Sequence, residues 1–414
     1  METLKQNSKR MGEYILTFIK WLLIASVVGI VGGGVGSAFH LSVDYVTELR
    51  HEHGWLLFLL PVGGVVICAM YHLFRGKGSI DTNRVLDSVR GGEKVPLVMV
   101  PLIFVSTVIT HMLGGSAGRE GAALQLGGGI GYNFGKLLRL KENDMHIIVM
   151  AGMSSVFAAL FGTPLTAAVF SLEVVNVGVF HYAGMLPCII AAVVAFNVAS
   201  MLGIAPVRFA GIAFDALALP SAFRVIALAV LCALVSILFC VAIKKCEHTM
   251  EKLLPNPYVR TVVGAALIVA LTLVLGSTDY NGAGMNIITD AIGGNAKPEA
   301  FLLKIIFTAI TISALFKGGE IVPAFFVGST FGCVAGALLG LEPSFGAAIG
   351  FVALFCGVVN CPLASLLLAL EVFGAEAIVY FAIACAVSYM MSGYFGLYKS
   401  QKFVYSKLHD NLLG

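Results

Sequence analysis

The chain has 414 residues, of which 58% are hydrophobic and only 12% are charged, and its formal net charge is +3. A typical soluble domain carries about 25% charged residues, so this composition places the chain in the membrane class. The small net charge gives no reason to expect nucleic acid as a partner. The nine cysteines form no C-x-x-C pair and no Cys/His cluster, so we expect no disulfide, no metal and no cofactor.

Apolar runs long enough to cross a bilayer, which takes roughly 18–20 residues, recur along the chain. They cover 15–49, 55–74, 95–115, 145–175, 177–203, 221–243 and 259–276, and residues 299–397 are almost continuously apolar. The first run is too long for a cleaved signal peptide. Basic residues flank the first and last runs, so we expect a multi-pass protein of the cell membrane with both termini in the cytoplasm.

A glycine-rich stretch at 114–129 places Arg119 and Glu120 between apolar segments. Charges at membrane depth are costly and are usually functional. The glycines leave backbone N–H groups free where a helix begins, and such a helix start can bind an anion. A carboxylate at this point can compete with the anion, so Glu120 is a candidate gate. A structural ion pair between Arg119 and Glu120 is the alternative, although adjacent residues of a helix point in different directions.

The two halves of the chain repeat one another. Pro164, Leu172 and Glu173 recur 198 residues later as Pro362, Leu370 and Glu371, and Gly118, Glu120 and Gly128 recur 200 residues later as Gly318, Glu320 and Gly328. Membrane transporters and channels are often built from such repeats, with broken helices that meet near the bilayer midplane.

We therefore predict an all-α polytopic membrane protein with two inverted-topology helical repeats, whose broken helices meet at a central anion site. The repeats span 15–203 and 221–397, and residues 204–220 link them. Residues 1–14 are expected to form a cytoplasmic N-terminal segment. Residues 398–414 are expected to contact the pore and to end in the cytoplasm.

Five motifs in register resemble the CLC family of chloride channels and anion/proton antiporters. Gly118–Gly121 is similar to the family's Gly-x-Glu-Gly-Pro stretch, with Ala122 in place of proline, and Gly318–Pro323 is similar to the stretch that opens the corresponding helix of the second half. Lys77–Ile80 resembles the central-site serine motif, Leu172–Val174 the helix with the inner acidic pair, and Lys402–Ser406 the stretch with the central-site tyrosine.

The resemblance implies a homodimer in which each subunit transports chloride or another halide. The anion-binding groups carried over are Ser79, Tyr405, Gly118, Arg119, Gly121, Glu320, Ile321 and Val322. The hydroxyls of Ser79 and Tyr405 and the N–H groups of 320–322 would surround the ion, and the N–H groups around 119–121 would form an outer site. Glu120 would fill the outer site when ionised and leave it when protonated. Glu120, Glu173 and Glu320 are the candidate proton pathway.

Three departures from the family pattern bear on ion identity and coupling. Val174 stands where antiporters usually carry a second acid, and an apolar side chain cannot relay a proton. Glu320 is an acid where most of the family is apolar, which resembles the fluoride-exporting branch, as do the length and the Gly162–Leu165 run. That branch usually lacks a serine at the position of Ser79. We predict chloride transport, by channel or antiporter, with a fluoride/proton antiporter as the alternative.

Several of these residues also have structural interpretations. Ser79 could cap a helix that begins at Asp81, and Tyr394, Tyr398 and Tyr405 lie where aromatic residues anchor a protein at the membrane interface. Equivalent positions in the two repeats favour a shared structural role for Glu173 and Glu371, such as accepting hydrogen bonds from free backbone N–H groups. An enzyme is not expected, since no His-Glu-x-x-His or Ser/His constellation occurs. A non-transporting membrane scaffold is the remaining alternative.

Overall fold

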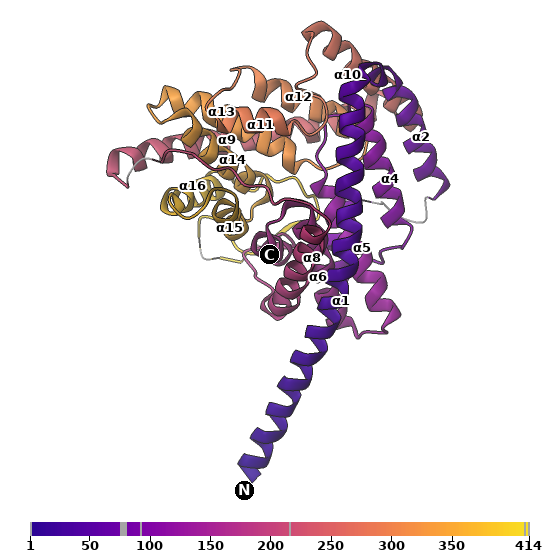
Figure 1. Ribbon diagram of the computed structural model, residues 1–414, viewed down its shortest axis with the longest axis vertical. Helices are drawn as coiled ribbons and strands as arrows, with labels where there is room; N and C mark the ends of the chain where they lie inside the picture. Colours follow the sequence, from indigo (N-terminus) through magenta and orange to yellow (C-terminus); the bar gives the residue numbers. More distant parts are fainter. Residues whose placement is uncertain (1, 75–80, 92, 215–216, 410, 413–414) are drawn as a thin grey trace.

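The computed structural model describes residues 2–74, 81–91, 93–214, 217–409 and 411–412, with side chains from Arg10 onward. It is mostly helical (Figure 1), with one pair of two-residue strands. The first half contains α1 (Glu2–Glu52), α2 (Leu60–Leu73), α3 (Thr82–Val89), α4 (Met99–Met112), α5 (Glu120–Leu137), α6 (Glu142–Phe161), α7 (Pro164–Glu173) and α8 (Met185–Met201). The second contains α9 (Leu219–Leu253), α10 (Pro257–Leu275), α11 (Met285–Ile292), α12 (Ala300–Ser313), α13 (Ile321–Leu338), α14 (Pro343–Val359), α15 (Pro362–Phe373) and α16 (Ile378–Met391). Short 3-10 helices cover Gly54–Leu59 and Tyr182–Gly184.

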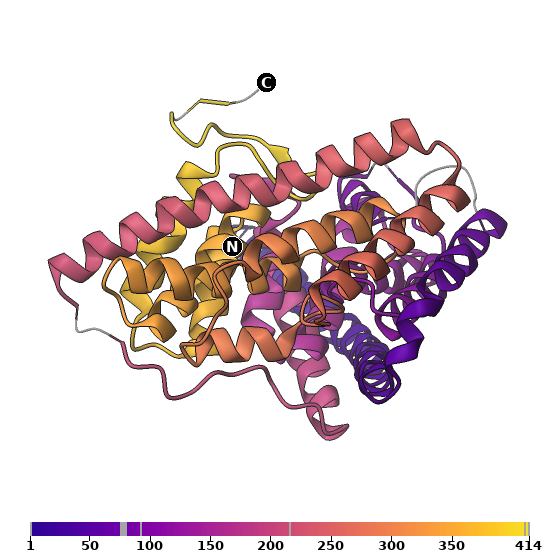
Figure 2. The ribbon, with the colours of Figure 1, turned by 90° about the horizontal axis from the view of Figure 1, so that it is seen from above.

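The two halves match helix by helix, which confirms the predicted repeat. The lengths of three matched pairs are identical: α3 and α11 have 8 residues, α4 and α12 have 14, and α5 and α13 have 18. Figure 2 shows the halves side by side, the first in indigo to magenta and the second in rose to yellow. Among the described residues, 7 helices are long and apolar enough to cross a membrane. The polytopic architecture follows from both observations.

Small residues bring the same helix pair together in each half. A Cβ atom on Gly127 of α5 would lie 2.2 Å from the carbonyl oxygen of Gly152 on α6, and one on Gly328 of α13 would lie 2.4 Å from that of Gly350 on α14. Backbones in such close contact pack by van der Waals forces, which hold helices together where lipid removes the hydrophobic driving force. These two tight pairs form the core around the starts of α5 and α13.

Each half caps a helix of the other half with a glutamate. Glu371 of α15 accepts hydrogen bonds from the N–H groups of Leu165 (2.9 Å) and Thr166 (2.8 Å) at the start of α7. Glu173 of α7 accepts from Leu363 (3.2 Å) and Ala364 (2.9 Å) at the start of α15. Both helices begin with a proline, which has no N–H, so the carboxylate satisfies the first donors that exist. The expected structural role of these two acids is confirmed by the four bonds.

The C-terminal segment crosses from the second half into the first. Strand β2 (Lys402–Phe403) pairs in parallel with β1 (Asn176–Val177). Just before β2, the side-chain amide of Gln401 donates to the carbonyls of Val174 (3.0 Å) and Val359 (2.8 Å). These bonds fix the loop that follows α16 against both halves.

Removal of a reciprocal cap should lower stability. Replacing Glu173 or Glu371 by alanine leaves two helix N–H groups without their charged acceptor, and each such bond contributes about 1.5–3 kcal/mol. We expect a lower melting temperature for both variants, measured by size-exclusion chromatography of the detergent-solubilised protein after heating. Glu376→Ala is the matched control because Glu376 is exposed. A Glu173→Ala melting temperature equal to that of the control would contradict the capping role.

Candidate anion pathway

The starts of α5 and α13 are joined by two short backbone hydrogen bonds. The N–H of Gly118 donates to the carbonyl of Gly319 and the N–H of Gly319 donates to the carbonyl of Gly118, both at 2.7 Å. The two residues form an antiparallel bridge. A Cβ atom on Gly319 would lie 2.4 Å from the backbone nitrogen of Gly121, so the approach requires glycine. The bridge brings two helix N-termini together in the protein interior, where their dipoles favour negative charge.

Glu120 places its carboxylate at the start of the opposite helix. The residue is fully buried. Its Oε2 accepts a hydrogen bond from the N–H of Val322 in the first turn of α13, at 3.3 Å. Its Oε1 is buried and has no hydrogen-bond partner in the described part of the chain. The carboxylate therefore occupies a position in which an anion could accept the same N–H.

Arg119 does not use its guanidinium to bind Glu120. Its Nη1 donates to Oδ1 of Asp44 on α1 at 2.7 Å, and Asp44 is also paired with His40 at 3.0 Å. The alternative of a structural Arg119–Glu120 ion pair is therefore wrong. Glu120 is left with backbone N–H groups as its donors. Such neutral donors suit a carboxylate that binds to a helix start and is released from it.

Glu320 is the counterpart of Glu120 on the other side of the bridge. It is half-buried and immediately precedes α13. Its Oε2 lies 3.6 Å from the position that a Cβ atom on Gly121 would take, at the start of α5. It interacts electrostatically with Glu247, Asp81 and Glu120. Two carboxyl groups thus flank one backbone bridge, each beside the first turn of the helix from the other half.

A cavity of about 350 Å³ lies directly against Glu120. We call it the outer cavity. Its charged and histidine side chains are Asp44, Arg50, His51, His111, Arg119, Glu120 and Asp279, and Val322 also lines it. The cavity connects the gate candidate to polar groups of α1 and of the 278–286 segment.

Tyr398, and not Tyr405, is buried within electrostatic range of the two acids. The Tyr405 side chain is 40% exposed and Tyr398 only 6%. The Tyr398 hydroxyl is buried without a hydrogen-bond partner among the described residues, and it interacts electrostatically with Glu320 and Glu120. Tyr405 packs instead against Gly178 and bridges to Leu412. The anion-binding role predicted for Tyr405 does not fit its place on the surface.

The loop that carries Tyr398 is held by bonds to distant elements. Leu397 donates its N–H to the carbonyl of Val358 at 3.0 Å. Ser400 accepts from the Arg90 guanidinium through its carbonyl and donates its N–H to Asn83 at 3.0 Å. The sequence contained a signal for the burial of Tyr398, because the apolar pair Gly396–Leu397 precedes it. Tyr405 is instead flanked by Lys402 and Lys407.

The structure thus brings together most of the predicted site. Gly118, Gly121, Glu120, Glu320, Ile321 and Val322 all lie at the two helix starts. Arg119 lies beside them with its side chain turned to Asp44. Ser79 and the Lys77–Ile80 motif fall outside the described residues. Glu173, a candidate for the proton pathway, has both carboxylate oxygens bonded to α15.

Two buried cations near the site were missed from sequence. Arg50, at the end of α1, is 9% exposed, and Lys304 of α12 is fully buried. Each is a single basic residue next to apolar runs. Only its buried position in the structure shows that it is relevant to the site.

Comparison with known proteins identifies the family of this chain. Residues 63–393 match the family model described as voltage gated chloride channel. The chain belongs to this family, the CLC proteins. Over 400 residues it is 36% identical to a CLC relative from Pseudomonas syringae pv. tomato named chloride/fluoride channel protein, covering 95% of this chain and 88% of the relative.

Two solved CLC structures share the fold. A CLC-type fluoride/proton antiporter superposes with a TM-score of 0.88 at 30% identity, covering 93% of this chain and 98% of the other. A slow cyanobacterial Cl⁻/H⁺ antiporter superposes with a TM-score of 0.76 at 20% identity, covering 90% and 94%. The predicted family and architecture are confirmed.

The two tyrosines can be separated by mutation. We expect Tyr398→Phe to slow halide efflux from liposomes by roughly 2- to 10-fold, because a neutral hydrogen bond contributes about 0.5–1.5 kcal/mol. Tyr405→Phe makes the same chemical change on the surface and should transport as the unchanged protein does. A slow Tyr405→Phe beside a normal Tyr398→Phe would reverse the assignment.

Proposed function

We propose that this CLC protein is a fluoride/proton antiporter in which Glu120 is the gate and Glu320 takes part in proton transfer. Halide transport across the membrane is the activity of its family, and the chain has the fold that carries it. The observation that carries the finer proposal is the pair of carboxyl groups on the two sides of the Gly118–Gly319 bridge.

The position of Glu120 supports the gating role. When ionised, its carboxylate holds the N–H of Val322 and keeps a halide from it. Protonation removes the charge that the helix start favours, and the side chain can then leave. The vacated N–H groups and the Tyr398 hydroxyl are neutral donors. Neutral donors replace the hydration of an anion but still allow its release, which transport requires.

A second carboxyl group is needed to bring protons to Glu120 from the opposite side of the bridge. Val174 cannot do this, and Glu173 is occupied as a helix cap. Glu320 is an ionisable group within electrostatic range of Glu120 and also of Glu247 and Asp81. It therefore connects the gate to the side of the protein where those acids lie. A simple channel would have no use for this second carboxyl group.

The relatives favour fluoride as the ion. The structure that superposes with a TM-score of 0.88 is that of a fluoride/proton antiporter, and the 36% identical relative carries fluoride in its name. Chloride is the second candidate, favoured by the serine motif around Ser79. We further propose a homodimer in the cell membrane, with halide, protons and lipid as its partners and both termini in the cytoplasm.

Parallel flux measurements test the proposal. Liposomes containing the purified protein should release fluoride much faster than chloride, with proton uptake recorded by external pH. Glu120→Gln should remove the pH dependence and the proton movement, because the amide cannot be protonated in this range. Glu320→Gln should uncouple protons from fluoride.

The control is Glu173→Gln, which retains one side-chain oxygen as a cap and should remain coupled. Chloride efflux without proton movement in the unchanged protein would exclude the antiporter. Full coupling in Glu320→Gln would exclude Glu320 from the pathway.

A further inference from the structure

Arg50 carries a buried positive charge without a carboxylate partner, and the amino group of Lys304 is buried nearby. Within the described residues, neither forms an ion pair with any acidic side chain. A buried charge normally requires compensation, because removal from water is expensive. The uncompensated guanidinium of Arg50 beside the candidate anion pathway therefore needs an explanation.

The bonding of Lys304 is satisfied by backbone carbonyls. Its Nζ donates to the carbonyls of Tyr280 (3.2 Å) and Gly282 (2.7 Å) and lies 5.0 Å from the ring centroid of Phe326. These contacts satisfy the amino group of Lys304 within the protein. Arg50 is therefore the basic side chain whose burial remains to be explained.

Arg50 is bonded less completely and lines the outer cavity. Its Nη1 donates to the carbonyl of His111 at 2.7 Å, the one hydrogen bond of this guanidinium within the described part of the chain. The fork lies against the bare backbone of Gly282, where a Cβ atom would be 2.7 Å from Nη1 and 2.9 Å from Nη2. The glycine makes room for the guanidinium, and Arg50 lines the same cavity as Glu120.

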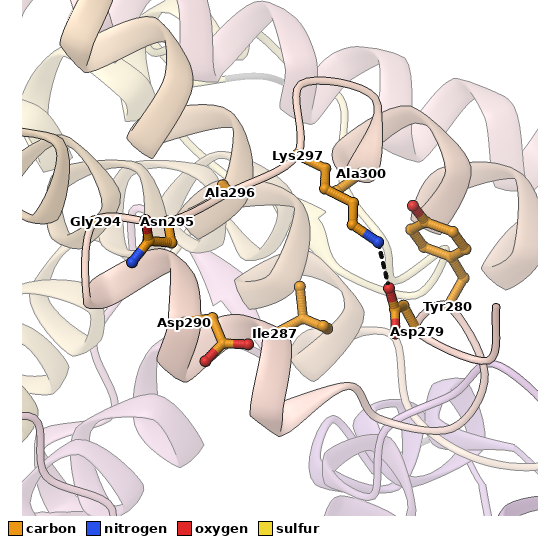
Figure 3. A pocket seen from close by; sticks show the side chains of 9 residues that line it. All are labelled: Asp279, Tyr280, Ile287, Asp290, Gly294, Asn295, Ala296, Lys297 and Ala300. Atoms are coloured by element: carbon orange, nitrogen blue, oxygen red, sulfur yellow. Dashed lines mark hydrogen bonds and ion pairs between the residues drawn. The ribbon is translucent and has the colours of Figure 1, made fainter.

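The other charges of the outer cavity are paired. Asp44 holds Arg119 at 2.7 Å. Asp279 holds Lys297 at 2.9 Å, an ion pair drawn as the dashed line in Figure 3, at the boundary with a second cavity of about 430 Å³. With these pairs set aside, Arg50 and Glu120 remain as the unpaired charges of the described cavity lining. When Glu120 is protonated, Arg50 is left as the unbalanced charge.

We propose that Arg50 forms an anion-binding site in the outer cavity, which holds a halide while Glu120 is protonated. The guanidinium is a fixed, permanently charged fork with several donors, which suits anion recognition. Low-dielectric walls concentrate its field in the cavity. The site uses a side-chain cation, so it differs from the neutral backbone site at the helix starts. It rests on halide transport but not on fluoride preference or proton coupling.

The test is bromide binding in crystals of the full-length protein. Crystals of the unchanged protein and of Glu120→Gln, soaked in sodium bromide, should show an anomalous peak beside the Arg50 guanidinium, stronger in the variant. Arg50→Gln, which retains an amide donor for the His111 carbonyl, should lose that peak, and Arg50→Lys should keep it. Arg50→Gln should also raise the half-saturating concentration of the transported halide by about tenfold.

The matched control is Arg224→Gln, because Arg224 also donates to a carbonyl, that of Gly340 at 3.0 Å, but is exposed in the second half. It should leave binding and uptake unchanged. Absence of bromide beside Arg50 in both the unchanged protein and Glu120→Gln would overturn the proposal, as would a peak that persists in Arg50→Gln. If Arg50→Gln does not fold, loss of the peak in folded Arg50→Lys overturns it, since the charge is retained. The crystals report anion binding and not flux. A failed antiport assay would therefore not affect the result of the bromide test.

Discussion

The pair of 2.7 Å hydrogen bonds between Gly118 and Gly319 is the contact on which the rest of the site depends. It fixes α5 and α13 with their first turns side by side. It also accounts for the glycines, since a Cβ atom on Gly319 would lie 2.4 Å from the backbone nitrogen of Gly121 and one on Gly118 would lie 2.3 Å from Oε2 of Glu120. Because the bridge satisfies the backbone groups of the extended residues, the following N–H groups remain free to bind negative charge. Glu120 and Glu320 then reach the opposite helix from either side of it.

At α7 and α15, too, an acid from each half contacts a helix start of the other half. There the negative groups are permanent, because each glutamate accepts two N–H bonds and each helix starts with a proline. At α5 and α13 the Glu120 carboxylate accepts one N–H from the opposite helix. The contrast between four saturating bonds and one longer bond distinguishes acids that hold the structure from the acid that we propose to exchange with an ion.

The sequence alone identified those site residues that are charged in apolar surroundings or that recur in both repeats. Glu120, Glu320 and the two capping glutamates are of this kind, and their positions followed from the 198- and 200-residue offsets. Which tyrosine is buried near the two acids was not predictable in this way. Three tyrosines follow α16, and which of them is buried depends on bonds from Ser400 and Gln401 to residues about 227 to 317 positions away. Arg50 and Lys304 likewise gain their significance from packing against the 280–282 segment, which no local pattern records.

The reciprocal caps have a consequence for how the chain is made. When the first half has been inserted into the membrane, the acceptors for the start of α7 belong to a helix roughly 200 residues further along the chain. Until that helix is synthesised, α7 has no lasting partner for its first N–H groups in a solvent without water. The halves are therefore interdependent, because each supplies the acceptors for a helix start of the other.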